Sequence, residues 1–317
     1  MDELSSDKNT LSEPYLRPNR MSAISHLLIG LGVFVLCASV FSLIGAMAFG
    51  ITLQEIKDGI DVFARFSGKP LALKVFVFFS SSLPLIVAVV VIGYIINSNS
   101  KVYLRLNMPK MSVVFLLSLG FVFFSLPLLG PLMELNKMID LSQWPALNKW
   151  LASQDASNNK AYEAMIGEKN VMSFLWSVLF MAFLPALAEE LFFRGFLMNV
   201  FNGIFKNMHI AIIVTSLIFS VIHLQVLKFI PMFFLAVTFG YAVYWTNSIW
   251  TSILAHFINN LLAVFQLYFI TDGDYTKAVN ETPQLPLAAT AVVCMLVAAI
   301  FYYNQTKSNT KSTNFYV

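Results

Sequence analysis

The amino-acid sequence predicts an all-α protein, a polytopic transmembrane bundle of about eight helical spans. The first observation is composition: 58% of the 317 residues are hydrophobic and only 12% are charged, whereas a soluble domain carries about 25% charged residues. The second is length, because the apolar stretches are long enough, or nearly so, to cross about 30 Å of hydrocarbon as helices. The third is that neither an internal repeat nor a soluble domain interrupts this pattern.

The predicted spans divide the chain into five regions. A polar tail at 1–22 precedes 23–170, which holds three spans and an amphipathic segment; 171–270 holds four spans, 271–304 holds one, and a polar tail follows at 305–317. We expect the two tails to lack a fold of their own. The apolar stretches run approximately over 27–51, 71–96, 112–133, 171–201, 209–226, 228–246, 248–270 and 285–303.

The charge and the cysteines exclude several classes of protein. The net charge is +3 without a cluster of Lys and Arg, so we expect membrane lipid as a partner and no nucleic acid. Cys37 and Cys294 lie within separate apolar stretches. They form no disulfide framework and lack the spacing of metal ligands.

The first apolar stretch has two interpretations. Ala46 and Ala48 resemble the cleavage site of a signal peptide. However, a polar lead of more than 20 residues precedes the stretch, and it is longer than the usual 7–15 residues of a signal peptide's apolar region. We therefore expect a retained first span.

The connections between spans predict the orientation. The loop at 97–111 carries Lys101, Arg105 and Lys110 and no acidic residue, which favours a cytoplasmic position. With eight spans, both termini then lie in the cytoplasm and 134–170 faces outward. We expect a multi-pass protein of a bacterial cytoplasmic membrane.

Tryptophans mark two interfacial positions. An amphipathic piece on the outer surface is indicated by the helical spacing of Trp144, Leu147, Trp150 and Leu151. Trp245 and Trp250 bracket a short connection and fit an aromatic belt.

Few ionisable residues lie deep within the predicted spans, and each costs about 3 kcal/mol near the bilayer centre. They are Glu189, Glu190, Arg194, His223 and His256. With the turn at 202–208 as the cytoplasmic end, Glu189 lies roughly 18 Å and His223 roughly 22 Å into the membrane. His256 lies roughly 12 Å in, and Asn260 roughly 18 Å. Three helices therefore bring polar side chains to similar depths.

The segment "EELFFR" contains two different kinds of glutamate. Glu190 and Arg194 are four residues apart, so they can neutralise each other on one helix face. This pair fits a structural salt bridge between helix residues, which could also hold the neighbouring residues of a functional site in place. Glu189 points about 100° away, and an unpaired carboxylate in a membrane is a functional candidate. Pro185, one turn earlier, removes a backbone hydrogen bond and is expected to kink the helix.

The segments "FSVIH" and "HFINN" supply the other polar groups. His223 could simply bond a neighbouring helix, but it shares its depth with Glu189. His256 and Asn260 are four residues apart and share a face, with Asn259 as a possible substitute for Asn260. Together they offer donors suited to an oxyanion; the alternative is a contact between helices.

Other protease chemistries lack their motifs in this sequence. Neither HExxH nor GxSxG occurs. Instead, "EELFFR", "FSVIH" and "HFINN" resemble the EExxxR, FxxxH and HxxxN motifs of the CPBP family, the CAAX-processing and bacteriocin-processing (Abi) intramembrane endopeptidases. All three occur in order on separate predicted helices, within the region 171–270.

The resemblance implies an enzyme that hydrolyses a peptide bond of a membrane-associated protein or peptide. It implies that Glu189 and His223 activate a water, that His256 and Asn260 stabilise the oxyanion, and that Glu190 and Arg194 hold and polarise the site. The rival from another class is a transporter or an interaction protein with a buried polar cluster. Against transport, the polar residues gather at one depth and inverted repeats are not visible.

Metal is the open point of this mechanism. Glu189, His223 and His256 form a plausible zinc set of two imidazoles and one carboxylate. We favour the glutamate mechanism without a cofactor, because committing His256 to a metal would remove an oxyanion donor and leave Asn260 without a partner.

Overall fold

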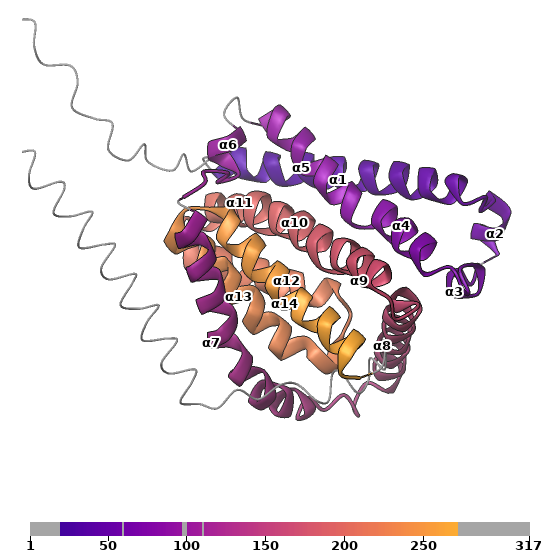
Figure 1. Ribbon diagram of the computed structural model, residues 1–317. Helices are drawn as coiled ribbons and strands as arrows, with labels where there is room; N and C mark the ends of the chain where they lie inside the picture. The colour runs from indigo at the N-terminus through magenta and orange to yellow at the C-terminus, as the bar shows by residue number, and fades with distance from the viewer. Residues whose placement is uncertain (1–19, 59, 97–99, 110, 272–317) are drawn as a thin grey trace, which may run out of the picture.

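The computed structural model describes residues 20–58, 60–96, 100–109 and 111–271, and all regular structure in them is helical. Figure 1 shows the helices as one bundle, with α7 and α8 on opposite sides of α12 and α14. The all-α polytopic bundle predicted from the sequence is confirmed.

Six helical segments of the described residues are long and apolar enough to cross a membrane. They are Ser22–Ala48, Pro70–Ile96, Val113–Lys137, Val171–Phe205, Val226–Thr246 and Ile249–Phe269. The predicted stretch at 209–226 corresponds to α12 (Met208–Ile222), which has 15 residues and rises only about 22 Å. This helix is therefore shorter than a full span. The predicted stretch at 285–303 lies outside the described residues.

In the first half of the chain, α1 pairs with α4 and α5, whereas α7 packs against α13 and α14 of the second half. α1 (Arg20–Ala48) is followed by the short α2 (Leu53–Lys57) and α3 (Val62–Arg65). The second predicted span is divided into α4 (Pro70–Ser80) and α5 (Ser82–Ile96). Then follow α6 (Ser100–Tyr103), α7 (Met111–Lys137) and α8 (Pro145–Ile166).

The fourth span is one long helix in five parts. These are α9 (Val171–Ser177), the π-helical η1 (Val178–Phe183), α10 (Leu184–Glu190), the π-helical η2 (Leu191–Leu197) and α11 (Met198–Phe205). α12 follows, then the 3-10 turn η3 (Val226–Lys228), α13 (Phe229–Thr246) and α14 (Ile249–Phe269).

Pro185 is the second residue of α10, directly after η1. Because proline has no amide hydrogen to donate, the regular hydrogen-bond ladder is interrupted at this point. The interruption predicted at Pro185 accompanies a π-helical segment, a form frequently found near functional sites.

α1 packs against the bundle through a close contact. It lies beside α5 and α11, and a Cβ atom on Gly30 would stand 2.1 Å from Phe196 Cζ. A similar approach joins α12 to α13, where a Cβ on Gly240 would stand 2.8 Å from Ile212 Cγ2. A side chain at either position would therefore force Phe196 or Ile212 to move.

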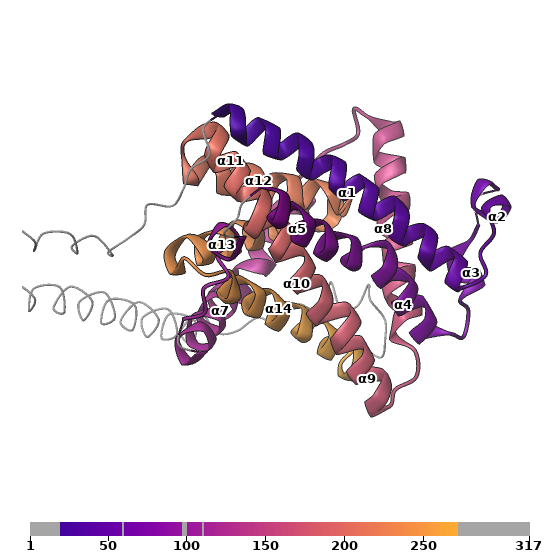
Figure 2. The ribbon, with the colours of Figure 1, turned by 90° about the horizontal axis from the view of Figure 1, so that it is seen from above.

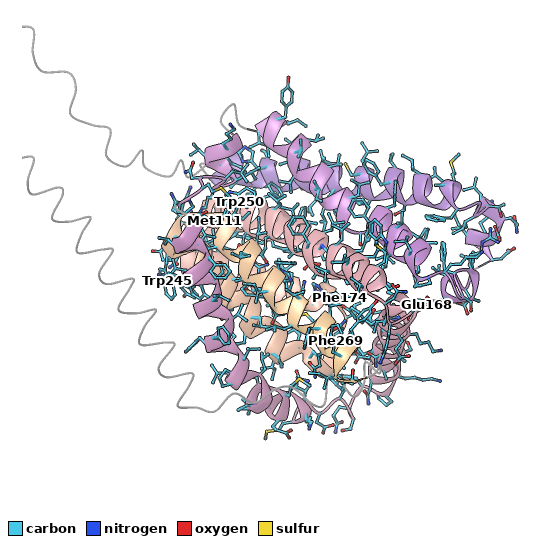
Figure 3. All side chains as sticks on the ribbon, viewed as in Figure 1. Met111, Glu168, Phe174, Trp245, Trp250 and Phe269 are labelled. Carbon is cyan, nitrogen blue, oxygen red and sulfur yellow. The ribbon has the colours of Figure 1, made fainter. Side chains whose placement is uncertain are left out.

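The bundle has two distinct ends (Figure 3). Met111, Trp245 and Trp250 lie at one end, and Glu168, Phe174 and Phe269 lie at the other. At the first end, Trp250 Nε1 donates to the carbonyl of Leu106 (3.1 Å), which ties the loop before α7 to the connection between α13 and α14. Those two connections share one side, as the predicted orientation requires.

α8 differs from the other long helices in direction. Figure 2 shows it crossing α1, α4 and α9 steeply at one end of the bundle. Trp144, Leu147 and Trp150 are exposed, by 61%, 43% and 46%, whereas Asp155 is buried. The helix thus lies across the spans, and its predicted place on the outer membrane surface stays a prediction.

Candidate active site

The long helix α9–α11 carries three of the predicted site residues. Glu189 and Glu190 are the last residues of α10, and Arg194 follows in η2. Arg194 Nη1 donates to Glu190 Oε1 at 2.8 Å, and the two side chains are 1% and 0% exposed. The ion pair inferred from the spacing is thus present, and it is completely removed from solvent and lipid.

The guanidinium of Arg194 has further partners on two other helices. Its Nη2 donates to the carbonyl of Ala236 on α13 at 2.9 Å. Its Cζ lies 4.9 Å from the ring centre of Phe219 on α12 and 5.8 Å from that of Phe239 on α13. Both distances suit cation–π contacts, so Arg194 connects its own helix with α12 and α13.

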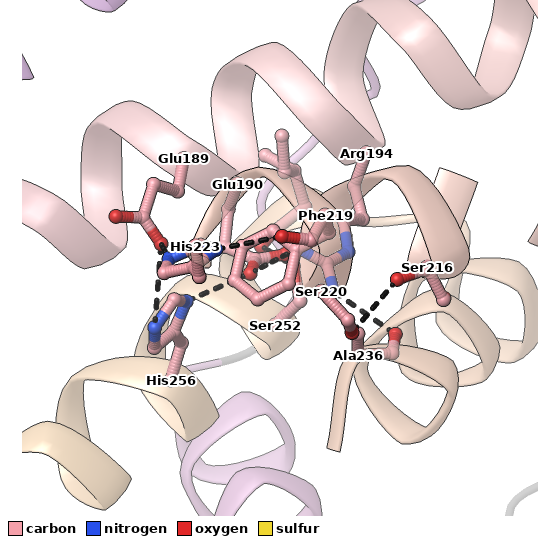
Figure 4. A network of polar contacts seen from close by, with 11 residues as sticks. Glu189, Glu190, Arg194, Ser216, Phe219, Ser220, His223, Ala236, Ser252 and His256 are labelled. Atoms are coloured by element: carbon pink, nitrogen blue, oxygen red, sulfur yellow. Dashed lines mark hydrogen bonds and ion pairs between the residues drawn. The ribbon is translucent and has the colours of Figure 1, made fainter. Parts of the chain in front are cut away.

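His256, on α14, joins the same carboxylate. Its Nδ1 lies 2.9 Å from Glu190 Oε1, and its ring stacks on Phe239 at 5.2 Å between centroids. Because a carboxylate only accepts hydrogen bonds, Nδ1 carries a hydrogen and donates it. Glu190 therefore accepts from Arg194 and His256 together, and it fixes the imidazole in orientation (Figure 4).

His223 occupies the end of α12, where it caps the helix. Its Nδ1 donates to the backbone carbonyl of Phe219 at 2.6 Å, since a carbonyl can only accept. The hydrogen on Nδ1 leaves Nε2 of a neutral His223 as an acceptor. The Nε2 atom of His223 can therefore accept a proton as a base or bind a metal ion as a ligand.

Glu189 faces both imidazoles. Its Oε2 lies 3.9 Å from His223 Nε2 and 3.8 Å from His256 Nε2. These separations are too long for direct hydrogen bonds and suit a bridging water. Glu189 is 21% exposed and His223 26%, whereas His256 is 8% exposed, so the gap between the three is reached from the side of Glu189 and His223.

Asn260 lies one helical turn beyond His256 on α14 and is half-buried, as is Asn259. Among the described residues, neither asparagine has a hydrogen-bond partner in the protein. The structure thus brings Glu189, Glu190, Arg194, His223 and His256 into one network, and no hydrogen bond between described residues joins Asn260 to it.

Several members of this network could not be recognised in the sequence. The carbonyl of Ala236 and the ring of Phe239 come from apolar stretches without a distinguishing pattern. Phe219 begins the segment "FSVIH", but the sequence alone assigns its ring no contact with Arg194. Ser252 lies beside Glu190 in Figure 4 and stands four residues before His256, a helical spacing that could have been noticed.

The three facing groups are chemically suited to zinc, but they are spread apart. A histidine that ligates zinc usually donates its second nitrogen to a carbonyl or carboxylate, which both rings do here. However, bonds of about 2.0–2.2 Å to one tetrahedral ion require ligand atoms closer than the 3.8–3.9 Å observed. Within residues 20–271 as described, no group of three His, Cys, Asp or Glu is arranged to hold a metal ion.

The comparisons with known proteins concern the same region. Residues 171–262 match a family model described as type II CAAX prenyl endopeptidase Rce1-like. The match begins with α9 and ends within α14, so it includes all six residues of the predicted site. No curated protein and no solved structure matches the chain.

Proposed function

We propose that this chain, whose residues 171–262 belong to the Rce1-like family of CAAX endopeptidases, hydrolyses a peptide bond with a water activated by Glu189 and His223. The family supports a multi-pass membrane peptidase that acts on a peptide or protein. The observation that carries the finer proposal is the gap of one water between Glu189 Oε2 and the Nε2 atoms of His223 and His256.

A count of charges supports different roles for the two histidines. Ionised Glu189 and Glu190 with Arg194 leave one negative charge, and an uncompensated charge in a membrane is costly. One proton on an imidazole neutralises the cluster. His256 is the better carrier, because its Nδ1 already donates to Glu190, and its Nε2–H then becomes a donor toward the gap.

The reaction follows from these assignments. Glu189 accepts a proton from the bridging water, with His223 Nε2 as the second acceptor, and the hydroxide attacks the carbonyl carbon of the peptide. The oxyanion accepts hydrogen bonds from His256 Nε2 and the amide of Asn260, each worth about 3–4 kcal/mol as a good donor. The carbon–nitrogen bond then breaks, and the proton held by Glu189 passes to the leaving amine.

The proposed mechanism needs no metal, and a chelator tests this point. The alternative has Glu189, His223 and His256 as ligands of a zinc ion, which would lower the pKa of a bound water. We expect the purified protein to keep its activity after dialysis against a strong chelator. Activity that is lost and then restored by stoichiometric zinc would contradict the metal-free mechanism and leave the same residues at the site.

Substitution of Glu189 tests the function itself. The full-length protein in lipid vesicles should cut membrane-bound peptides, offered with and without a C-terminal prenyl group. Glu189→Gln keeps the size of the side chain and removes the base, so we expect no cleavage and unchanged thermal unfolding. Glu163→Gln, which alters an exposed glutamate on α8, should cut like the wild type. Normal turnover by Glu189→Gln would contradict the proposed function.

A further inference from the structure

The turn that follows His223 is held by side chains from outside the family segment. Leu224 adopts a left-handed conformation with φ 51°, the chain passes through η3, and α13 begins at Phe229. Asn136, near the end of α7, reaches this turn from a position that is 4% exposed. Its Nδ2 donates to the carbonyl of Val226, and its Oδ1 accepts from the amide of Ile230, each at 2.8 Å.

Two residues of α8 hold the same turn from the other side. The carboxylate of Asp155 accepts from the backbone amide of Leu227 and is 8% exposed. Asn158 Nδ2 donates to the carbonyl of His223 at 3.5 Å, the outer limit of a hydrogen bond. We call Asn136, Asp155 and Asn158 the polar strap. It supplies hydrogen-bond partners to the carbonyls of His223 and Val226 and to the amides of Leu227 and Ile230.

The turn joins two helices that both carry parts of the site. α12 ends in His223. α13 contributes the carbonyl of Ala236, which binds Arg194, and the ring of Phe239, on which His256 stacks. A displacement of the turn would therefore move His223 relative to Glu189 and disturb the support of His256.

We infer that Asn136 is a positioning residue, which holds His223 one water away from Glu189 through the turn 224–230. The inference rests on the proposed function. Asn136 has no contact with the reacting groups, yet its amide binds both the Val226 carbonyl and the Ile230 amide. Removing it leaves the Ile230 amide without this acceptor and the Val226 carbonyl with only the Phe229 amide. A misplacement of about 1 Å in an active site can lower the rate about 100-fold.

The test compares two substitutions of Asn136 with a matched control in lipid vesicles. For Asn136→Ala we expect kcat to fall about 10- to 100-fold, with KM within about twofold of the wild type. Asn136→Asp keeps the acceptor for Ile230 and loses the donor to Val226, so its kcat should be intermediate. Asn148→Ala, which changes an exposed asparagine of α8, should leave kcat unchanged.

Hydrogen exchange measures the turn without reference to activity. We expect amides of the peptide 219–232 to exchange faster in Asn136→Ala than in the wild type, at a temperature where both remain folded. Unchanged exchange, or faster exchange with unchanged kcat, would overturn the positioning role and leave the proposed function standing. A wild type that cuts no peptide would instead overturn the proposed function, and with it the catalytic part of this inference. If Asn136→Ala fails to fold, the test rests on Asn136→Asp. A kcat of Asn136→Asp equal to that of the wild type would then refute the positioning role.

Discussion

Glu190 is the most deeply buried acidic residue in the described part of the chain, and it binds Arg194 of its own long helix and His256 of α14. Glu190→Gln keeps the shape but leaves the charge of Arg194 without a counter-charge. Breaking a buried pair in this way costs about 3–5 kcal/mol, and we expect a correspondingly lower temperature of thermal unfolding as well as lower activity.

The chain offers a matched control for that prediction. Glu134 and Lys137 form an equally close pair, 2.7 Å between charged atoms, with side chains 71% and 61% exposed. Because exposed pairs contribute only about 0–1 kcal/mol, Glu134→Gln should unfold nearly like the wild type. Equal effects of the two substitutions would show that Glu190 is not ionised against Arg194.

Asp155 makes the attachment of α8 dependent on pH. Burial raises the pKa of its carboxyl above 3.8, against the lowering effects of the Leu227 amide and Lys228. With a raised pKa, the folded protein binds more protons than the unfolded chain between the two values, so the free energy of unfolding falls as pH rises through that window. Asp155→Asn removes this titration.

The difference in unfolding temperature between the wild type and Asp155→Asn measures this effect. As pH rises from 3.8, we expect the unfolding temperature of the wild type to fall relative to that of Asp155→Asn. Above the raised pKa the difference should reach a plateau. A difference that is independent of pH would mean that the Asp155 carboxyl does not titrate with a raised pKa.

At the scale of the elements, the packing of α1 depends on one glycine. A Cβ on Gly30 would meet the ring of Phe196, whereas a Cβ on Gly32 would meet nothing within 4 Å. Gly30→Ala should therefore lower stability by about 1–3 kcal/mol through overpacking. Phe196 lies two residues from Arg194 in η2, so we also expect lower activity.

Gly32→Ala, on the same helix, serves as the control in the same thermal unfolding and cleavage assays. It should keep activity and leave stability unchanged or raise it by up to about 1 kcal/mol, because alanine favours the helix over glycine. If Gly30→Ala behaved like Gly32→Ala, the close contact between α1 and η2 would be wrong.

The interruptions of the long helix α9–α11 show which features of a helix can be predicted from the sequence and which cannot. The sequence predicts the apolar run, although the helix ends at Phe205 and not at Phe201, and Pro185 indicates an irregularity. The π-helical form of η1 and η2 was not readable, because the choice between hydrogen-bond ladders depends on how neighbouring helices press on the same backbone. The end of α12 at His223 was missed for a related reason, since the residues on both sides of the turn are apolar.

For the whole molecule, orientation in the membrane is a prediction that labelling can test. Lys101 on α6 and Lys149 on α8 are both exposed and lie in connections at opposite ends of α7. In a variant without Cys37 and Cys294, expressed in bacteria, a cysteine at 101 should react with an impermeant thiol reagent only after the cells are opened. A cysteine at 149 should react in intact cells.

The reverse pattern of labelling would invert the topology. Positions 134–170, and with them α8 and the polar strap, would then face the cytoplasm. The network around Glu189 would be unchanged, but the side from which substrate approaches His223 would be the opposite one.

The sequence by itself determined the class of fold and the ionisable members of the central network. Composition alone excludes a soluble domain, and the four-residue spacing of Glu190 and Arg194 fixes their pairing, because helix geometry relates residues within one element. The scarcity of ionisable residues in the spans also singled out Glu189, His223 and His256, since each must have a partner or a function to offset its cost in a membrane.

Only the tertiary structure decided which atoms meet and what supports them. In α5, Val89 is 1% exposed and the adjacent Val90 is 63% exposed, although the two are identical in sequence. Lipid and protein interior are both apolar, so hydropathy does not distinguish the packed face of a spanning helix from the lipid-facing one. The acceptors that set the two imidazoles, and the reach of Asn136 to the turn behind His223, follow from that packing and from no local pattern.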